Sequence, residues 1–268
     1  MQHSERGFSL VELAIVIAII GLITGGIFAG QRVLNASKDR ALITQMEQFR
    51  QATMQFKDAY DYSPGDMPNA TDYWGALDSG DGAGSDCFTT EATGLATCNG
   101  NGDGKVYNPT GGTGVWVNGE RFTFWQHLAN AGLINGSFTG RTDSTTHNYT
   151  LTADKNSPAS KTAEPGLWAV HVGFSQVETT TFFPSKHKMK LELRNDVGVS
   201  AHRSPLYANT MYKIDSKVDD GMPGLGQIHS YKNGATGAPG CATTDDAYTA
   251  EYDVAYTTNR CHFRYLAM

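Results

Sequence analysis

The stretch Gly7-Phe8-Ser9-Leu10-Val11-Glu12, with the apolar run that continues to Ala29, decides the fold of the first part of the chain. Glu12 is the single charged residue between Phe8 and Ala29. These 22 residues form about 33 Å of α-helix at about 1.5 Å per residue, enough to cross a bilayer core about 30 Å thick. A transmembrane helix over residues 8–29 is therefore predicted.

The flanks of this run indicate that the helix stays on the mature protein. A secretory signal places its cleavage site after the apolar region, at small residues in an A-x-A-like pattern. No such site follows Ala29. A cut at the junction of Gly7 and Phe8 lies ahead of the run, so it would leave the membrane helix in place.

Gly7-Phe8-Ser9-Leu10-Val11-Glu12-Leu13, behind a short polar leader that ends in Arg6, resembles the class III leader junction of type IV pilins and type II secretion pseudopilins. The resemblance implies that a membrane prepilin peptidase removes residues 1–7. It implies that the new N-terminal Phe8 is N-methylated, and that Glu12 pairs with the terminal amine of a neighbouring subunit. It is strong over the N-terminal segment and weak over the remainder.

The cost of placing a charge in a membrane is a second reason, independent of the resemblance, to expect a role for Glu12. A carboxylate on a bilayer-facing helix costs several kcal/mol unless it is neutralised or paired. Hydration at the membrane interface accounts for Glu12 in an isolated subunit. In a filament of packed helices, a free amine at Phe8 would be its natural counter-charge. We hypothesise that Glu12 selects subunits for assembly.

Helical periodicity continues beyond the apolar run. Apolar residues recur at spacings of four and three, with charged and amide residues, among them Gln45, on the other face. Ser63-Pro64-Gly65 then ends the pattern. One helix is predicted over residues 8–62. Many members of the family carry Pro at the position of Ala29, and the nearby Gly25-Gly26 could supply the same weakness. The apolar face comprises Leu42, Met46, Phe49, Thr53, Phe56 and Tyr60.

Residues 63–268 are numerous enough for one globular domain with its own core. Short apolar or alternating runs at 167–174, 186–194 and after Cys261 predict strands, and the basic face of the second run is expected to be solvated. Residues 122–133 predict an amphipathic helix, and Ser204-Pro205 the start of another. The predicted fold class is α+β and pilin-like, with an antiparallel sheet packed on the second half of the long helix.

The four cysteines fall into two local pairs. Export would place them in an oxidising compartment, and short loops favour the pairings Cys87–Cys98 and Cys241–Cys261. Zinc is the alternative, although the chain contains no C-x-x-C spacing.

Two acidic segments are candidate calcium sites. Asn99, Asn101 and Asp103, followed by Gly104, match the first half of an EF-hand loop, but Thr110 stands where the closing Glu belongs. The alternative is a metal-free turn.

The second segment is Asp215-Ser-Lys-Val-Asp219-Asp220-Gly221-Met-Pro223, which resembles an element in the C-terminal part of some large pilin-like proteins. Asp219 and Asp220 either ligate a cation or cap the turn at Gly221, and capping is favoured. No cofactor is otherwise required.

Composition and motifs exclude several functions. The net charge of −6 argues against a general nucleic-acid surface. The chain has no H-E-x-x-H, G-x-S-x-G or Gly-Lys-Ser/Thr phosphate loop, so catalysis is not predicted.

The expected function is that of a structural subunit, either a minor pilin or a pseudopilin. Its implied partners are other pilin subunits, the prepilin peptidase and an inner-membrane assembly platform. The precursor would cross the inner membrane once, with the globular part in the periplasm, and would then enter a pilus or pseudopilus. The alternatives are a filament-tip adhesin or binding module and a membrane-anchored periplasmic enzyme.

Overall fold

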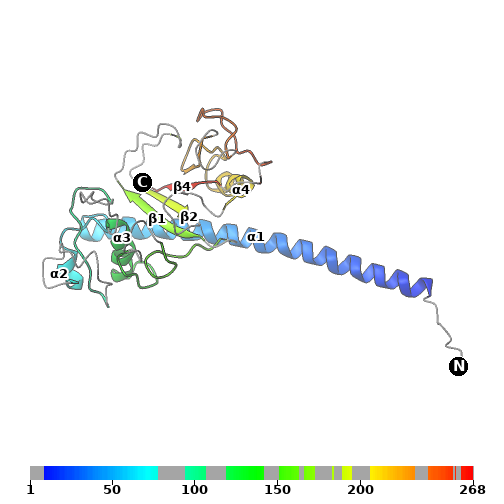
Figure 1. The fold of residues 1–268 in the computed structure, drawn as a ribbon, viewed down its shortest axis with the longest axis horizontal. Coiled ribbons are helices and arrows are strands. Elements are labelled where there is room, and N and C mark those ends of the chain that lie inside the picture. The colour runs from blue at the N-terminus through cyan, green and yellow to red at the C-terminus, as the bar shows by residue number, and fades with distance from the viewer. Residues whose placement is uncertain are drawn as a thin grey trace, which may run out of the picture.

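The computed structural model describes residues 9–77, 94–106, 119–141, 151–162, 166–172, 183, 189–194, 206–232, 241–255, 257 and 261–267. Helix α1, Leu10–Tyr60, is a rod whose N-terminal half projects away from the rest of the molecule (Figure 1). Its C-terminal half carries the globular part. The predicted long helix is confirmed, and it ends at Asp61, which adopts a left-handed conformation with φ 63°.

The described strands form one antiparallel sheet in the order β1-β2-β4-β3. They are β1 (Leu167–Val172), β2 (Met189–Arg194), β3 (Ile228–His229) and β4 (Phe263–Leu266). Leu193 of β2 pairs with Trp168 of β1 and with Phe263 of β4. The predicted α+β class, with an antiparallel sheet packed against the second half of the long helix, is confirmed.

The core lies between α1, the sheet and three shorter helices, α2 (Ala70–Trp74), α3 (Glu120–Asn130) and α4 (Ala208–Val218). Phe49 of α1 sits at its centre. Its ring centroid lies 4.9 Å from that of Trp125 on α3 and 5.6 Å from that of Trp168 on β1, both in edge-on contact. Such aromatic pairs stabilise a core beyond their buried area. The predicted apolar face of α1 thus packs as expected.

Three local predictions are wrong. All six residues of β2 are buried, so its basic face is not solvated; there Glu192 forms ion pairs with Arg194 and Arg264 at 3.0 and 3.1 Å. Helix α3 is buried on both faces rather than amphipathic, because it is enclosed by other segments. Helix α4 begins at Ala208 with Tyr207 as its N-cap, not at Ser204-Pro205.

Candidate functional site

The helix start is built by a reciprocal pair of hydrogen bonds. The Ser9 hydroxyl accepts from the N–H of Val11 at 3.3 Å, and the Glu12 carboxylate accepts from the N–H of Ser9 at 2.9 Å. This capping box satisfies backbone donors that have no partner inside the helix. Gly7 and Phe8 lie outside the described residues, so cleavage and methylation there stay predictions.

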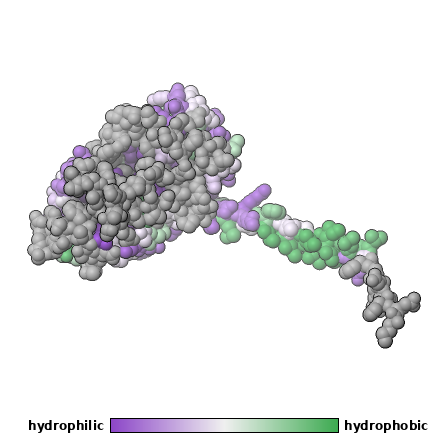
Figure 2. All heavy atoms as spheres, viewed as in Figure 1, coloured by the Kyte–Doolittle hydropathy of each residue, from purple (hydrophilic) through white to green (hydrophobic). Residues whose placement is uncertain are grey.

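The N-terminal half of α1 exposes a continuous apolar surface. Large apolar side chains from Leu10 to Leu34 are 48–86% exposed, and they form the green sleeve of the projecting rod in Figure 2. Within the described residues, α1 is the one helix long and apolar enough to cross a membrane, with a mean hydropathy of 2.5 in an 18-residue window. A helix that is apolar all round requires lipid or protein around it. This one fits a single-pass inner-membrane anchor.

No break occurs at the glycines of this half. The helix is continuous through Gly25, Gly26 and Ala29. The Thr24 hydroxyl donates a hydrogen bond to the carbonyl oxygen of Ile20 at 2.8 Å, so it adds no unpaired donor to the apolar surface. The apolar half of α1 and the half that carries the globular part therefore form one continuous helix.

The Asn99–Asp103 loop is hydrogen-bonded within itself and to α2. The side chain of Asn101 accepts from the N–H of Asp103, and that of Asp103 accepts from the N–H of Lys105, each at 2.9 Å. Asn99 accepts from the N–H of Thr71 at 2.9 Å, which links the loop to α2. The loop is therefore held both internally and to a distant part of the chain.

The second acidic segment forms a capped turn after α4. Asp219 accepts the N–H groups of Gln227 and Ile228, and Asp220 accepts that of Met222. Asp215, which is fully buried, accepts the N–H of Gly221 and the hydroxyl of Tyr252.

Oxygens of Asp215, Asp219 and Asp220 lie within 4.8 Å of one another, close enough to hold a metal ion. Burial chiefly, together with the other two carboxylates, raises the pKa of Asp215 to about 7. Each carboxylate nevertheless accepts the donors just described, which is the geometry of turn capping.

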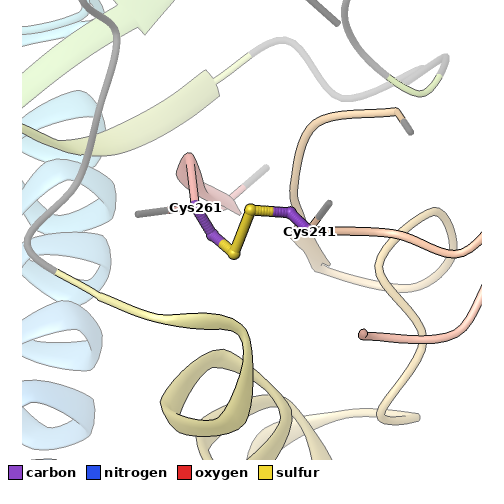
Figure 3. The surroundings of a disulfide bond; sticks show 2 residues. All are labelled: Cys241 and Cys261. Carbon is purple, nitrogen blue, oxygen red and sulfur yellow. A yellow bond between two sulfur atoms is a disulfide. The ribbon is translucent and has the colours of Figure 1, made fainter. Parts of the chain in front are cut away.

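Cys241 and Cys261 form a disulfide with a Cα–Cα distance of 5.5 Å, as their spacing predicts (Figure 3). It joins the start of the β4 segment to the preceding loop. Cys98 is also disulfide-bonded. Cys87 lies outside the described residues, so the pairing of Cys87 with Cys98 stays a prediction.

Two buried polar residues with structural roles were not singled out from the sequence. His127 on α3 accepts the N–H of Gly65 at Nδ1, at 3.0 Å, and its Nε2 lies 3.0 Å from the Thr97 hydroxyl. Burial lowers the pKa of His127 to about 4, so the ring is neutral at pH 7. Gln45 was assigned to the polar face of α1 but is buried, with hydrogen bonds to residues far along the chain. Only long-range contacts, which periodicity does not report, distinguish these residues.

A comparison with known protein families supports the resemblance that the N-terminal residues show. Residues 2–28 match the prokaryotic N-terminal methylation motif, the class III prepilin leader signature of type IV pilins and pseudopilins. No curated protein and no solved structure matches the chain.

Proposed function

We propose that this protein is a pilin-like structural subunit, a minor pilin or pseudopilin. In this proposal, prepilin peptidase cuts the precursor after Gly7, and the subunit is then assembled through α1 into a type IV pilus or a type II secretion pseudopilus. The observation that carries the proposal is the methylation motif, located at the head of a helix whose apolar half is exposed and whose other half carries a folded domain.

The exposed half of α1 supports assembly. Burying a Leu, Ile or Val side chain contributes about 1.5–3 kcal/mol, so this surface is stable only in lipid or against similar helices. The described globular part leaves it bare. Packing against other copies would replace the lipid when the subunit leaves the membrane.

Glu12 is the proposed assembly residue. Its capping bond to Ser9 uses one of about four acceptor sites on the carboxylate. The remaining sites can accept from the amine of a neighbouring Phe8. This pairing would remove the cost of a bare carboxylate among apolar helices.

Two variants separate pairing from capping. Glu12→Gln keeps a side chain able to complete the capping box but removes the charge, whereas Ser9→Ala weakens the cap and keeps the charge. We expect Glu12→Gln to be cleaved normally yet absent from purified filaments, and Ser9→Ala to be incorporated. Equal incorporation of both variants would refute the role of Glu12.

Mass spectrometry of the mature protein tests processing independently of assembly. The expected N-terminus is methylated Phe8. A chain that retains an unmethylated Met1 in the membrane and in filaments would overturn the whole proposal.

A further inference from the structure

Basic residues gather on α1 between its apolar half and the globular part. The segment between Ala29 and Glu47 carries three basic residues and one acidic residue, a local excess of positive charge on a chain whose net charge is −6. Figure 2 shows hydrophilic side chains at this junction, next to the apolar sleeve. The four charged residues are Arg32, Lys38, Asp39 and Arg40.

The spacing along the helix places this segment in the layer of lipid headgroups. Leu34, which is 62% exposed, is the last large apolar side chain that α1 exposes before the globular part. From Leu10 to Leu34 the exposed apolar surface is about 36 Å long at about 1.5 Å per residue, a length that a tilted helix accommodates in a hydrocarbon core of about 30 Å. Lys38 follows about 6 Å further along the axis. The headgroup layer is about 5–8 Å thick on each side, so Lys38 lies within it.

A pocket opens at this level between α1 and α4. Its volume is about 230 Å³, which is less than the about 300–1,000 Å³ of sites that enclose a whole drug-sized ligand. Lys38 of α1 and Lys213 of α4 both line it, as do the side chains of Asn35 and Asn209. The size and the lining suit a small anionic group at the end of a larger molecule.

Both ammonium groups of the pocket are available to a ligand. Lys38 and Lys213 are exposed, and neither forms an ion pair in the described part of the chain. Asp39 also lines the pocket without pairing with them, so the lining has a net charge of +1. Helix α4 begins here, and its N-cap Tyr207 makes no side-chain cap hydrogen bond, so the positive end of the helix dipole adds to the two lysines.

We propose that this pocket binds the phosphate of an anionic phospholipid headgroup, in the leaflet from which α1 emerges towards the globular part. A phosphodiester carries one negative charge, which balances the net charge of the lining. The ammonium groups of Lys38 and Lys213 donate to its oxygens, and the side-chain amides of Asn35 and Asn209 are further donors. A zwitterionic headgroup fits less well, because it brings an ammonium group of its own. Bound lipid holds the globular part against the membrane surface while the subunit is anchored.

The test must separate headgroup preference from insertion, because the apolar half of α1 inserts into any bilayer. The full chain in detergent micelles is titrated with phosphatidylglycerol or with phosphatidylcholine, and the retained lipid is counted by native mass spectrometry. We expect one phosphatidylglycerol to bind at least about tenfold more tightly than phosphatidylcholine, and this preference to shrink as salt is added. Equal affinity for the two lipids would overturn the proposal.

Free phosphate is the other source of the same chemistry. An equal concentration of inorganic phosphate should leave the lipid bound, because the acyl chains hold the headgroup at the depth of the pocket. Displacement of phosphatidylglycerol by inorganic phosphate would refute the assignment to a lipid.

Two matched double variants locate the site. Lys38→Gln with Lys213→Gln should weaken phosphatidylglycerol binding about 30-fold, because each lysine near an anionic surface contributes about fivefold. Lys57→Gln with Lys217→Gln removes one lysine from each of the same helices, outside the lining of the pocket, and should leave binding unchanged. All four lysines are exposed, so both variants should fold. Equal losses in the two variants, or no loss in the first, would refute the pocket as the site.

The proposal rests on the membrane-anchored stage of the proposed function and is independent of filament assembly. The measurement uses the unassembled subunit. Its failure would therefore leave cleavage after Gly7 and the role of Glu12 to their own assays.

Discussion

Removing the side chain of Gln45 should weaken the attachment of the globular part to α1. Its amide nitrogen donates to the carbonyl of Ala159 at 2.8 Å. Its amide oxygen accepts both the N–H of Lys161 and the indole N–H of Trp168, each at 3.0 Å. One side chain on the helix thus fixes a loop and a strand that lie more than a hundred residues away in sequence.

The magnitude follows from these three bonds. A hydrogen bond contributes about 1 kcal/mol net, and a buried donor left without a partner costs about 1–3 kcal/mol. In Gln45→Ala the indole N–H of Trp168, which is fully buried, loses its acceptor. We expect a loss of about 3 kcal/mol in the free energy of unfolding. For a domain of this size that corresponds to a fall of about 6–12 °C in Tm.

The assay is thermal unfolding of the full chain in detergent micelles, followed by near-ultraviolet circular dichroism. Gln45→Met keeps the volume and deletes the hydrogen bonds, so it should lose most of the same stability. Gln51→Ala is the matched control, because Gln51 is also a glutamine on α1 but its side chain is exposed. If Gln45→Ala melts within about 2 °C of Gln51→Ala, the reasoning fails.

Other predictions concern charge and the disulfide. Since the pKa of His127 falls from 6.5 to about 4 on folding, its contribution to stability should drop by about 3 kcal/mol as the pH falls from 6.5 to 4. The pKa of Asp215 rises from 3.8 to about 7, so its contribution is instead lost as the pH rises through that range. We therefore expect the free energy of unfolding of Asp215→Asn, measured by urea titration at a series of pH values, to fall more steeply towards acid pH than that of the wild type. Identical dependence on pH in the two proteins would contradict the pKa assigned to Asp215. Tyr252→Phe removes a donor to Asp215 and should cost about 1.5–3 kcal/mol at about pH 8, where that carboxylate is ionised, and less at about pH 5, as measured by the same titrations. Cys241→Ser combined with Cys261→Ser should cost about 3 kcal/mol in urea unfolding, and an unchanged midpoint would show that the bridge does not constrain the unfolded chain.

Local patterns were sufficient to predict the long helix. The apolar run after Phe8 and the four-and-three spacing through Phe56 are properties of neighbouring residues, so α1 and its buried face could be predicted. Gln45 and Gln48 look alike in such a pattern. One is buried and the other exposed because of residues more than a hundred positions away.

The wrong prediction for β2 has a similar cause. Alternation of charged and apolar residues normally indicates a strand in a sheet that has one solvent-exposed face. Here Arg194 and Arg264 are covered, with Glu192 between them as a shared partner. The alternation correctly indicated a strand, but it carried no information on what covers the second face. No local pattern singles out Asp66 either, because its contact with the N–H of Gly104 depends on tertiary packing.

The position of β4 bears on how the protein is made. Chains are synthesised from the N-terminus, so α1 is available to enter the membrane long before Phe263–Leu266 exist. Yet β4 lies inside the sheet, between β2 and β3, and β3 pairs with no other described strand. The sheet thus stays divided until Phe263–Leu266 have been synthesised. A chain that lacks Phe263–Leu266 would therefore keep β3 apart from β1 and β2, because no other described strand joins them.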